Sequence, residues 1–339
     1  MSNINENQVL KKKDFVSDQD VKWCPGCGDY AILAQVQKVF PTLGIKKEDF
    51  LVVSGIGCSS RFPYYMNTFG FHTIHGRAPA VASGAKLANP NLSVWMVTGD
   101  GDAMSIGGNH FIHVLRRNFD IKILMFNNKI YGLTKGQYSP TSELGKVTKS
   151  TPMGSLDHPF NPSTLALGAG ATYVARTLDR ETKHLAETIS LANNHKGSAF
   201  IDIYQNCNIF NDGAHSAYTD RETKHDNLIK LTHDAPMVFG ESGSKILKLE
   251  GSKFQVLELS DGFSIEDATI HNYEDKNLAF LLSEMTVDES LPTPIGIIYK
   301  EEKPTYDEMM EEQLKVAKEK KGHVDLQDII SGTNTWEVS

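Results

Sequence analysis

Two short segments combine acidic or amide side chains with glycine, a combination that suits the binding of a phosphate and a hard metal ion. Asp100 lies within Gly-Asp-Gly-Asp, and Asn128 lies within Asn-Asn-Lys-Ile-Tyr-Gly. Mg²⁺ takes about six oxygen ligands, usually including phosphate oxygens and water. Asp100 offers a carboxylate, Asn128 an amide oxygen and Ile130 its backbone carbonyl. Because glycine lets the backbone approach a phosphate closely, the two segments together predict a site for an anion such as a phosphate and for a hard metal ion.

Both segments directly follow strand-like runs of apolar residues. The runs Leu92–Thr98 and Ile121–Asn127 predict two buried strands, with a helix between them that is expected to begin near Ser105. Right-handed strand–helix–strand connections bring the ends of such strands to one edge of the sheet, where open α/β sheets bind ligands. The helix would direct its N-terminus at the phosphate charge. An isolated Gly-Asp-Gly is more often an ordinary turn, but twenty-five residues between Gly101 and Asn127 favour a ligand site.

The four cysteines of the chain form a second group of residues with possible chemistry. Cys24 and Cys27 lie in Trp-Cys-Pro-Gly-Cys-Gly, while Cys58 and Cys207 each follow a predicted strand. The latter two would therefore emerge at the same sheet edge as Asp100. Four thiolates that converge beside a cofactor site suit a [4Fe–4S] cluster.

Other interpretations of the cysteines stay open. A structural zinc site uses the same ligands, although it usually pairs a second Cys-x-x-Cys with the first. A thioredoxin-like dithiol needs a strand before the motif, and residues 1–22 are too polar to supply one. Buried cysteine acting as a small apolar side chain is a further alternative, above all for Cys58 or Cys207 taken singly.

The rest of the pattern predicts the frame that positions these residues. Short apolar runs alternate with stretches of helical periodicity, which predicts an α/β fold with a mostly parallel sheet and helices on both faces. Residues 134–163 are rich in Ser, Thr, Pro and Gly and too long for a simple connection, which indicates a functional loop. The predicted strands are Phe50–Ser54, Leu92–Thr98, Ile121–Asn127 and Ala199–Gln205, and the predicted helices are Asp29–Phe40, Arg77–Ala88, Ser105–Arg117 and Arg180–Asn194.

The chain is expected to have three parts. They are a polar arm over residues 1–20, a cofactor-binding domain over residues 21–215 and a more polar C-terminal extension over residues 216–339. The extension is expected to hold strands near residues 254–258 and 294–299 and a helix at Tyr306–Lys321.

Composition excludes several classes of function. A formal net charge of −8 makes a nucleic-acid or anionic-membrane surface a poor expectation. The N-terminal segment has no apolar core typical of a secretory signal, and the longest apolar runs are the size of strands. No Walker-type loop or Gly-x-Gly-x-x-Gly is present. These features favour a soluble cytoplasmic protein, in which cysteines are expected as reduced thiols or metal ligands.

Six motifs, in family order, resemble those of the beta subunits of two-component 2-oxoacid:ferredoxin oxidoreductases. Gly-Asp-Gly followed by Asn-Asn is also similar to the signature of thiamine diphosphate enzymes, and this resemblance implies the thiamine diphosphate-binding fold. Together the motifs cover about residues 20–215. They are Trp-Cys-Pro-Gly-Cys-Gly, Gly-Ile-Gly-Cys-Ser-Ser-Arg, His-Gly-Arg-Ala, Gly-Asp-Gly-Asp, Asn-Asn-x-x-Tyr-Gly-Leu-Thr-Lys-Gly-Gln and Asn-Cys-Asn.

The resemblance implies a role for each matching residue. It implies magnesium binding by Asp100, Asn128 and the Ile130 carbonyl, and contact of Lys135 with the substrate carboxylate. His75 is a second candidate for catalysis. The resemblance also implies that the [4Fe–4S] ligands are Cys24, Cys27, Cys58 and Cys207. It implies that thiamine diphosphate is lined by Ile56, Gly57, Ser59, His75, Gly101, Asp102, Gly132 and Leu133.

A structural alternative stands beside three of these roles. Lys135 could be a solvated loop lysine, and His75 a hydrogen-bonded structural histidine. Asp102 could cap the N-terminus of a helix.

The resemblance also implies an activity and its partners. Such an enzyme oxidatively decarboxylates a 2-oxoacid to an acyl-CoA and carbon dioxide, and ferredoxin takes the electrons. Thiamine diphosphate serves as the electron sink. An alpha subunit, in a heterodimer or heterotetramer, would supply the glutamate that thiamine enzymes need, so the single chain is expected to have no turnover. The loop 135–155 is similar to that of members acting on 2-oxoglutarate, with pyruvate also possible.

Two other functions remain as alternatives. One is a non-oxidative thiamine diphosphate enzyme, resembling a decarboxylase or acetolactate synthase, with zinc or free thiols at the cysteines. The other is a non-catalytic electron-transfer or zinc-binding scaffold subunit that binds no thiamine diphosphate.

Overall fold

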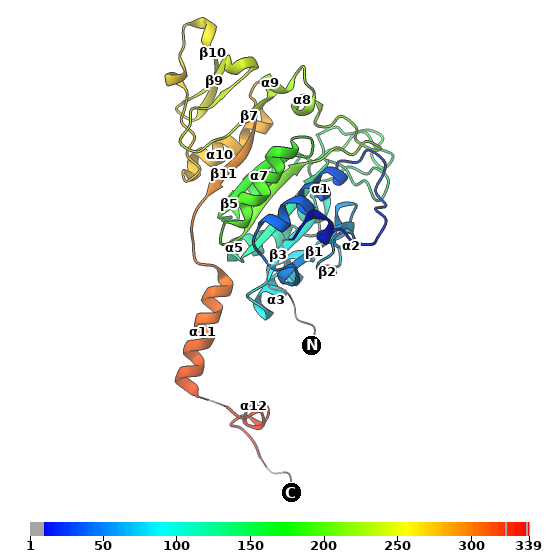
Figure 1. Cartoon of the computed structure of the whole chain (residues 1–339), viewed down its shortest axis with the longest axis vertical. Helices are drawn as coiled ribbons and strands as arrows, with labels where there is room; N and C mark the ends of the chain where they lie inside the picture. The colour runs from blue at the N-terminus through cyan, green and yellow to red at the C-terminus, as the bar shows by residue number, and fades with distance from the viewer. Residues whose placement is uncertain (1–9, 323, 337, 339) are drawn as a thin grey trace.

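An eight-stranded mixed sheet forms the centre of the molecule in the computed structural model, which describes residues 10–322, 324–336 and 338 (Figure 1). Its strand order is β2-β1-β3-β4-β6-β5-β11-β7. The first six strands in this order are parallel, β11 is antiparallel to β5, and β7 is parallel to β11. The strands are β1 (Phe50–Ser54), β2 (Phe69–His72), β3 (Ser93–Gly99), β4 (Ile121–Asn127), β5 (Tyr173–Leu178), β6 (Ala199–Tyr204), β7 (Leu228–Lys230) and β11 (Thr293–Lys300).

Helices cover both faces of this sheet, as predicted. On one face, α1 and α7 bury apolar side chains such as Ile32 and Ile189 against Val52, Trp95 and other residues of the sheet. On the other face, α3, α5, α6 and α10 pack on the alternate residues of the same strands. The covering helices are α1 (Asp29–Val39), α3 (Ala78–Ala88), α5 (Gly108–Arg117), α6 (Pro162–Gly168), α7 (Thr182–Asn193) and α10 (Lys276–Glu284).

The predicted helix Ser105–Arg117 is wrong at its N-terminus. A short helix, α4 (Asp100–Met104), begins directly after β3, and α5 begins only at Gly108. Between them, Ser105 has φ −93° and ψ −109°, which breaks the helical path. The predicted helix is therefore α5 alone, without its first three residues, and the helix that starts at the predicted phosphate site is α4.

The predicted C-terminal extension shares the central sheet with the preceding residues. Its strands β7 and β11 extend that sheet beyond β5, while β8 (Val238–Phe239), β9 (Lys245–Glu250) and β10 (Lys253–Glu258) form a separate three-stranded sheet. The predicted helix Tyr306–Lys321 is confirmed as α11, which leaves the body of the molecule as a rod (Figure 1). The remaining short helices are α2 (Phe62–Tyr65), α8 (Ser216–Thr219), α9 (Lys224–Asn227) and α12 (Leu326–Ser331).

The predicted N-terminal arm is only partly described, since residues 1–9 lie outside the described residues. Phe15, within the described part, is fully buried and packs edge-on against Phe40 and Phe50. This part of the arm therefore belongs to the apolar core. No helix among the described residues is long and apolar enough to cross a membrane.

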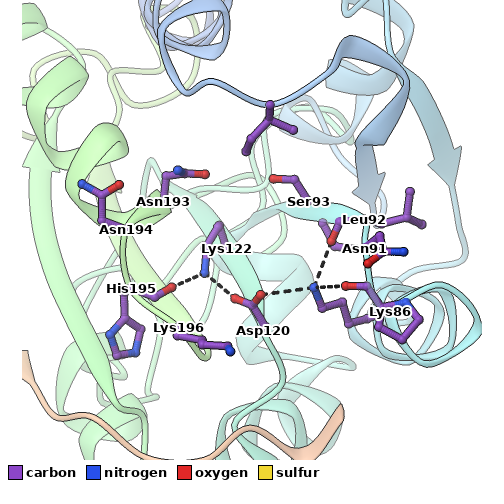
Figure 2. A pocket seen from close by; sticks show the side chains of 13 residues that line it. Lys86, Asn91, Leu92, Ser93, Asp120, Lys122, Asn193, Asn194, His195 and Lys196 are labelled. Carbon is purple, nitrogen blue, oxygen red and sulfur yellow. Dashed lines mark hydrogen bonds and ion pairs between the residues drawn. The ribbon is translucent and has the colours of Figure 1, made fainter. Parts of the chain in front are cut away.

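Two buried lysines share one aspartate at the amino ends of the central strands (Figure 2). Lys122 donates to Asp120 at 2.6 Å and Lys86 donates to the other oxygen of Asp120 at 3.1 Å. Each ammonium group also donates to two backbone carbonyls. Three acceptors use all three N–H groups of each lysine. The cavity of about 330 Å³ beside them therefore receives no free N–H group from either lysine, and the network fixes the strands rather than binding a ligand.

Candidate functional site

The predicted magnesium-binding segments leave the sheet side by side at its carboxyl edge. Gly99 at the end of β3 is the register partner of Phe126 in β4. Asp100 and Asn128 follow directly after these strands. Because β1 and β6 are parallel to β3 and β4, the loops carrying Cys58 and Cys207 begin at the same edge. This carboxyl edge, here called the rim, thus carries both predicted groups of residues.

Asp100 is buried and is held by two hydroxyl groups from the long loop 134–163. Ser139 donates to its carboxylate at 2.5 Å and Thr141 at 2.6 Å, both to the same oxygen. Thr141 also lies within hydrogen-bonding distance, 3.1 Å, of the Asn127 amide oxygen. Burial raises the pKa of Asp100 to about 6, although the two hydroxyl groups act to lower it. A cation at the other carboxylate oxygen would offset that cost of burial.

Asn128 is oriented by three neighbours. Its side-chain Nδ2 donates to Oε1 of Gln205 at 2.9 Å, and its Oδ1 accepts from the backbone N–H of Ile130 at 3.2 Å. Its backbone carbonyl accepts from Asn211 at 2.9 Å. Oδ1, the atom expected to bind magnesium, therefore points away from Gln205 and keeps one lone pair free. Ile130 itself is buried.

Asp102 uses both carboxylate oxygens to hold the neighbouring loops together. One oxygen accepts from the backbone N–H groups of Ile56 at 3.0 Å and Gly76 at 2.8 Å, and it also contacts Nδ1 of His75. The other accepts from the Thr98 hydroxyl at 2.7 Å. These bonds fix the loops that carry the predicted cofactor-lining residues. Because Asp102 contacts Nδ1 of the half-buried His75, the other ring nitrogen, Nε2, has no bond to Asp102.

The three loops that carry the cysteines are joined by hydrogen bonds. Trp23, beside Cys24, donates its ring N–H to the Cys58 carbonyl at 2.7 Å. Asn208, beside Cys207, donates to the Pro25 carbonyl at 2.7 Å. The four predicted ligands therefore lie on loops that meet at the rim, and none of them forms a disulfide.

Gly132 lies between two of the cysteines. A Cβ placed on Gly132 would lie 3.5 Å from Sγ of Cys207 and 3.6 Å from Sγ of Cys58. Burial, then the charge of Asp29 and the neighbouring cysteines, raises the pKa of the Cys58 thiol to about 12. The pKa of the Cys27 thiol is raised by the same kinds of cause. Thiolates here need a compensating positive charge.

Part of the predicted site is exposed. Leu133 and Lys135 lie on the tight turn between Tyr131 and Gln137, and the Lys135 side chain has no ion pair with any described residue. Tyr131 donates its hydroxyl to the Gly101 carbonyl at 3.0 Å, joining this turn to α4. Within the part of the chain that the structure describes, no three His, Cys, Asp or Glu side chains lie close enough to hold a single metal ion.

Ser139, Thr141, Gln205 and Asn211 belong to the site but were not predicted from the sequence. The first two lie in the loop 134–163, for which the sequence indicated a function but gave no partner for either hydroxyl group. Gln205 and Asn211 flank Cys207, and residues so close to a predicted ligand are natural candidates for its support.

Comparison with known proteins agrees with this geometry. Residues 55–203 match the family model for the C-terminal, TPP-binding domain of thiamine pyrophosphate enzymes. The chain is 51% identical to 2-oxoglutarate oxidoreductase subunit KorB of Mycobacterium tuberculosis, over 98% of this chain and 90% of that protein. It belongs to the family of 2-oxoacid:ferredoxin oxidoreductase beta subunits. The beta subunit of 2-oxoacid:ferredoxin oxidoreductase 1 from Aeropyrum pernix is 50% identical over 62% of this chain and 65% of its own.

A solved member of the family has the same fold over nearly the whole chain. A chain of the 2-oxoglutarate:ferredoxin oxidoreductase from Magnetococcus marinus superposes with a TM-score of 0.77 and 34% identity, covering 98% of each chain. That structure contains 2-oxoglutarate, coenzyme A and succinyl-CoA. The family resemblance predicted from the motifs is thus confirmed, and with it the thiamine diphosphate-binding fold. The non-oxidative enzyme and the scaffold subunit are not favoured.

Proposed function

We propose that the chain binds thiamine diphosphate, Mg²⁺ and a [4Fe–4S] cluster at the rim and acts, with an alpha subunit, on 2-oxoglutarate. The products would be succinyl-CoA, carbon dioxide and reduced ferredoxin. One observation carries the proposal: loops bearing Asp100, Asn128 and all four cysteines meet at one sheet edge of a beta-subunit family member. The choice of 2-oxoglutarate rests on the names of the Mycobacterium tuberculosis and Magnetococcus marinus proteins, and pyruvate is the second candidate.

The residues around Asp100 suit magnesium and a diphosphate. Asp100 is a buried carboxylate with one oxygen occupied by hydroxyl groups, and Asn128 presents an amide oxygen on the adjacent strand end. With the carbonyl of Ile130, these are hard oxygen donors of the kind that Mg²⁺ binds beside a phosphate. Bound thiamine diphosphate would supply the electron sink for decarboxylation. Ile56, Gly57, Ser59, His75, Gly101, Asp102, Gly132 and Leu133 would surround it.

The cysteines suit an iron–sulfur cluster better than a single ion. In a [4Fe–4S] cluster each thiolate binds its own iron, so the four sulfurs stand further apart than the ligands of one zinc ion. Because Gly132 has no side chain, the space beside the sulfur atoms of Cys58 and Cys207 is open. The thiols of Cys27 and Cys58 have raised pKa values, so a cationic centre would favour their thiolate forms. The cluster would accept electrons one at a time and pass them to ferredoxin.

Lys135 would bind the substrate carboxylate, and His75 would hold a proton. Lys135 is exposed on the turn after Asn128 and has no ion pair with a described residue, so its ammonium group is free to bind a carboxylate. Asp102 fixes Nδ1 of His75, so a proton at Nε2 would be held in a defined direction. All of these residues lie within residues 21–215, the part of the chain that the sequence predicted to bind cofactors.

The test uses the chain after anaerobic co-purification with its alpha subunit. We expect 2-oxoglutarate, coenzyme A and ferredoxin to give succinyl-CoA and reduced ferredoxin, and the chain alone to give none. Iron and acid-labile sulfide in equal amounts are expected, whereas zinc would support the alternative ligand set. Thiamine diphosphate binding by calorimetry should require Mg²⁺ and should be abolished by Asp100→Ala but not by Asp261→Ala, an exposed control. Turnover by the chain alone would contradict the proposal.

A further inference from the structure

We infer that Gln205 couples the magnesium ligand Asn128 to the cluster ligand Cys27, and so sets both magnesium affinity and cluster potential. The inference rests on the proposed magnesium and cluster sites. Gln205 follows β6 and is almost completely buried, with 1% of its surface exposed. Its side-chain amide lies between the two sites: Oε1 accepts from Asn128 at 2.9 Å, and Nε2 donates to Sγ of Cys27 at 3.4 Å.

The orientation of the Gln205 amide is fixed by a third partner. Nε2 also donates to the backbone carbonyl of Asn206 at 2.5 Å. A carbonyl can only accept, so the side-chain nitrogen must face it. Oε1 must then face Asn128, whose Nδ2 is the donor. The Asn206 carbonyl therefore determines which atom of Asn128 is turned towards Gln205 and which remains for a metal.

This chain of bonds acts on the magnesium site by preventing an amide flip. Oδ1 of Asn128 is a useful Mg²⁺ ligand, whereas Nδ2 is a donor and cannot bind a cation. Without the acceptor at Gln205, Asn128 would lose one of the two bonds that distinguish its side-chain atoms and would keep only the 3.2 Å bond from the backbone N–H of Ile130 to Oδ1. Supporting residues of this kind commonly change metal affinity ten- to one-hundred-fold.

The same amide acts on the cluster through an N–H···S bond. A donor directed at a thiolate stabilises negative charge on the sulfur, which is greater in the reduced cluster, and hydrogen bonds to sulfur are among the factors that set cluster potential. Loss of the donor should therefore lower the reduction potential. Gln205 is a positioning residue, because it reaches both cofactors only through Asn128 and Cys27.

Two variants separate the two effects. Gln205→Leu removes both the acceptor and the donor, so it should lower magnesium affinity about tenfold and also lower the cluster potential. Gln205→Glu keeps an acceptor for Asn128 and, when measured at alkaline pH where its buried carboxyl group is ionised, places an acceptor instead of an N–H donor beside Cys27 and the Asn206 carbonyl. It should retain near-normal magnesium affinity and lower the potential by at least the same amount. A tenfold change in the one-electron equilibrium corresponds to about 59 mV.

The measurements use the full complex loaded with its cluster. Cluster potential is measured by a spectroscopic redox titration, and magnesium affinity by calorimetry of thiamine diphosphate binding at varied Mg²⁺ concentration. Gln37→Leu is the matched control, because Gln37 is also a buried glutamine but donates to the backbone carbonyl of Tyr65 at 3.0 Å rather than to a proposed ligand. It should change neither quantity.

The outcomes distinguish this inference from the proposed function. If the unmodified complex contains no iron and sulfide, the proposed cluster fails first. If the unmodified complex has its cluster and both Gln205 variants keep the wild-type potential, the coupling is refuted. Should Gln205→Leu fail to load the cluster, Gln205→Glu still decides the matter, since a wild-type potential there overturns the inference and a lowered one supports it.

Discussion

Thr141 donates its hydroxyl to the carboxylate of Asp100 at 2.6 Å, although the two residues are 41 positions apart in the chain. This bond brings the long loop 134–163 onto the proposed magnesium site. Thr141→Val removes the hydroxyl while keeping the shape of the side chain. We expect it to weaken Mg²⁺-dependent thiamine diphosphate binding about tenfold, because Asp100 loses part of its orientation. Calorimetry measures the affinity.

Thr148→Val is the control for this substitution. Thr148 lies in the same loop, and its hydroxyl forms hydrogen bonds with the hydroxyl of Ser150 and with the hydroxyl and backbone N–H of Thr151. It should leave the affinity unchanged. Equal losses in the two variants would show that the loop, not the bond to Asp100, is responsible.

Gly132→Ala tests the space between Cys58 and Cys207. The added methyl would touch both sulfur atoms at ordinary contact distances of 3.5 and 3.6 Å, so the chain without a cluster should fold with unchanged thermal stability. The same methyl occupies space that a cluster needs, so iron and sulfide content should fall severalfold. Gly84→Ala, where a Cβ meets nothing within 4 Å, should keep full iron content. Full cluster content in Gly132→Ala would place the cluster elsewhere.

Asp120→Ala should destabilise the chain strongly, because it removes the carboxylate with which the buried Lys86 and Lys122 both form ion pairs. Removing one partner of a buried ion pair costs about 3–5 kcal/mol. The free energy of unfolding from urea titration measures the loss. Asp220→Ala breaks an exposed pair with Arg180 at 3.6 Å and should cost less than about 1 kcal/mol. Similar small losses at both positions would contradict the role of Asp120.

We expect the buried His195 to make the folded chain less stable in mild acid. Burial, then the charges of Lys122 and Lys300, lowers the pKa of His195 from 6.5 to about 4. Since the unfolded chain binds the proton more readily, the contribution of neutral His195 is complete above pH 6.5 and is lost as the pH falls towards 4. The difference of about 2.5 pKa units corresponds to a loss of about 3 kcal/mol over this range.

His195→Gln should reduce this slope of unfolding free energy against pH, whereas His225→Gln, at an exposed position, should not. An unchanged slope in His195→Gln would show that other groups carry the acid dependence. Urea titrations at pH 7, 5.5 and about 4.5 make the comparison.

The parts of the fold that could be predicted are those set by local pattern. The apolar runs of β1 and β4 predicted bounds that the structure reproduces, and α11 was predicted from its acidic-then-basic sequence. β5 was missed because Arg176 interrupts its apolar pattern. That arginine is fully buried and its charge is compensated by Asp202 of the next strand, at 3.3 Å. Such pairing depends on residues distant in sequence, which periodicity does not report.

The same distinction applies to the site. Cys24, Cys27, Asp100 and Asn128 could be predicted as ligands because each lies in a short, chemically distinctive motif. Ser139 and Thr141 were missed because a hydroxyl in an irregular loop has no pattern that reveals its partner. The helix break after Met104 was missed for a different reason, since it depends on the unusual backbone angles of Ser105.

The position of β11 has a consequence for how the chain is made. β5 lies between β6 and β11, and β11 comprises residues 293–300. At a synthesis rate of about 5–20 residues per second, β11 would leave the ribosome on the order of ten seconds after β5, so β5 would lack this neighbour for that time. In that interval the nascent chain presents an unpaired, apolar strand edge, which invites association with other chains. A fragment ending at residue 215 would keep that edge permanently, so we expect it to aggregate rather than fold alone.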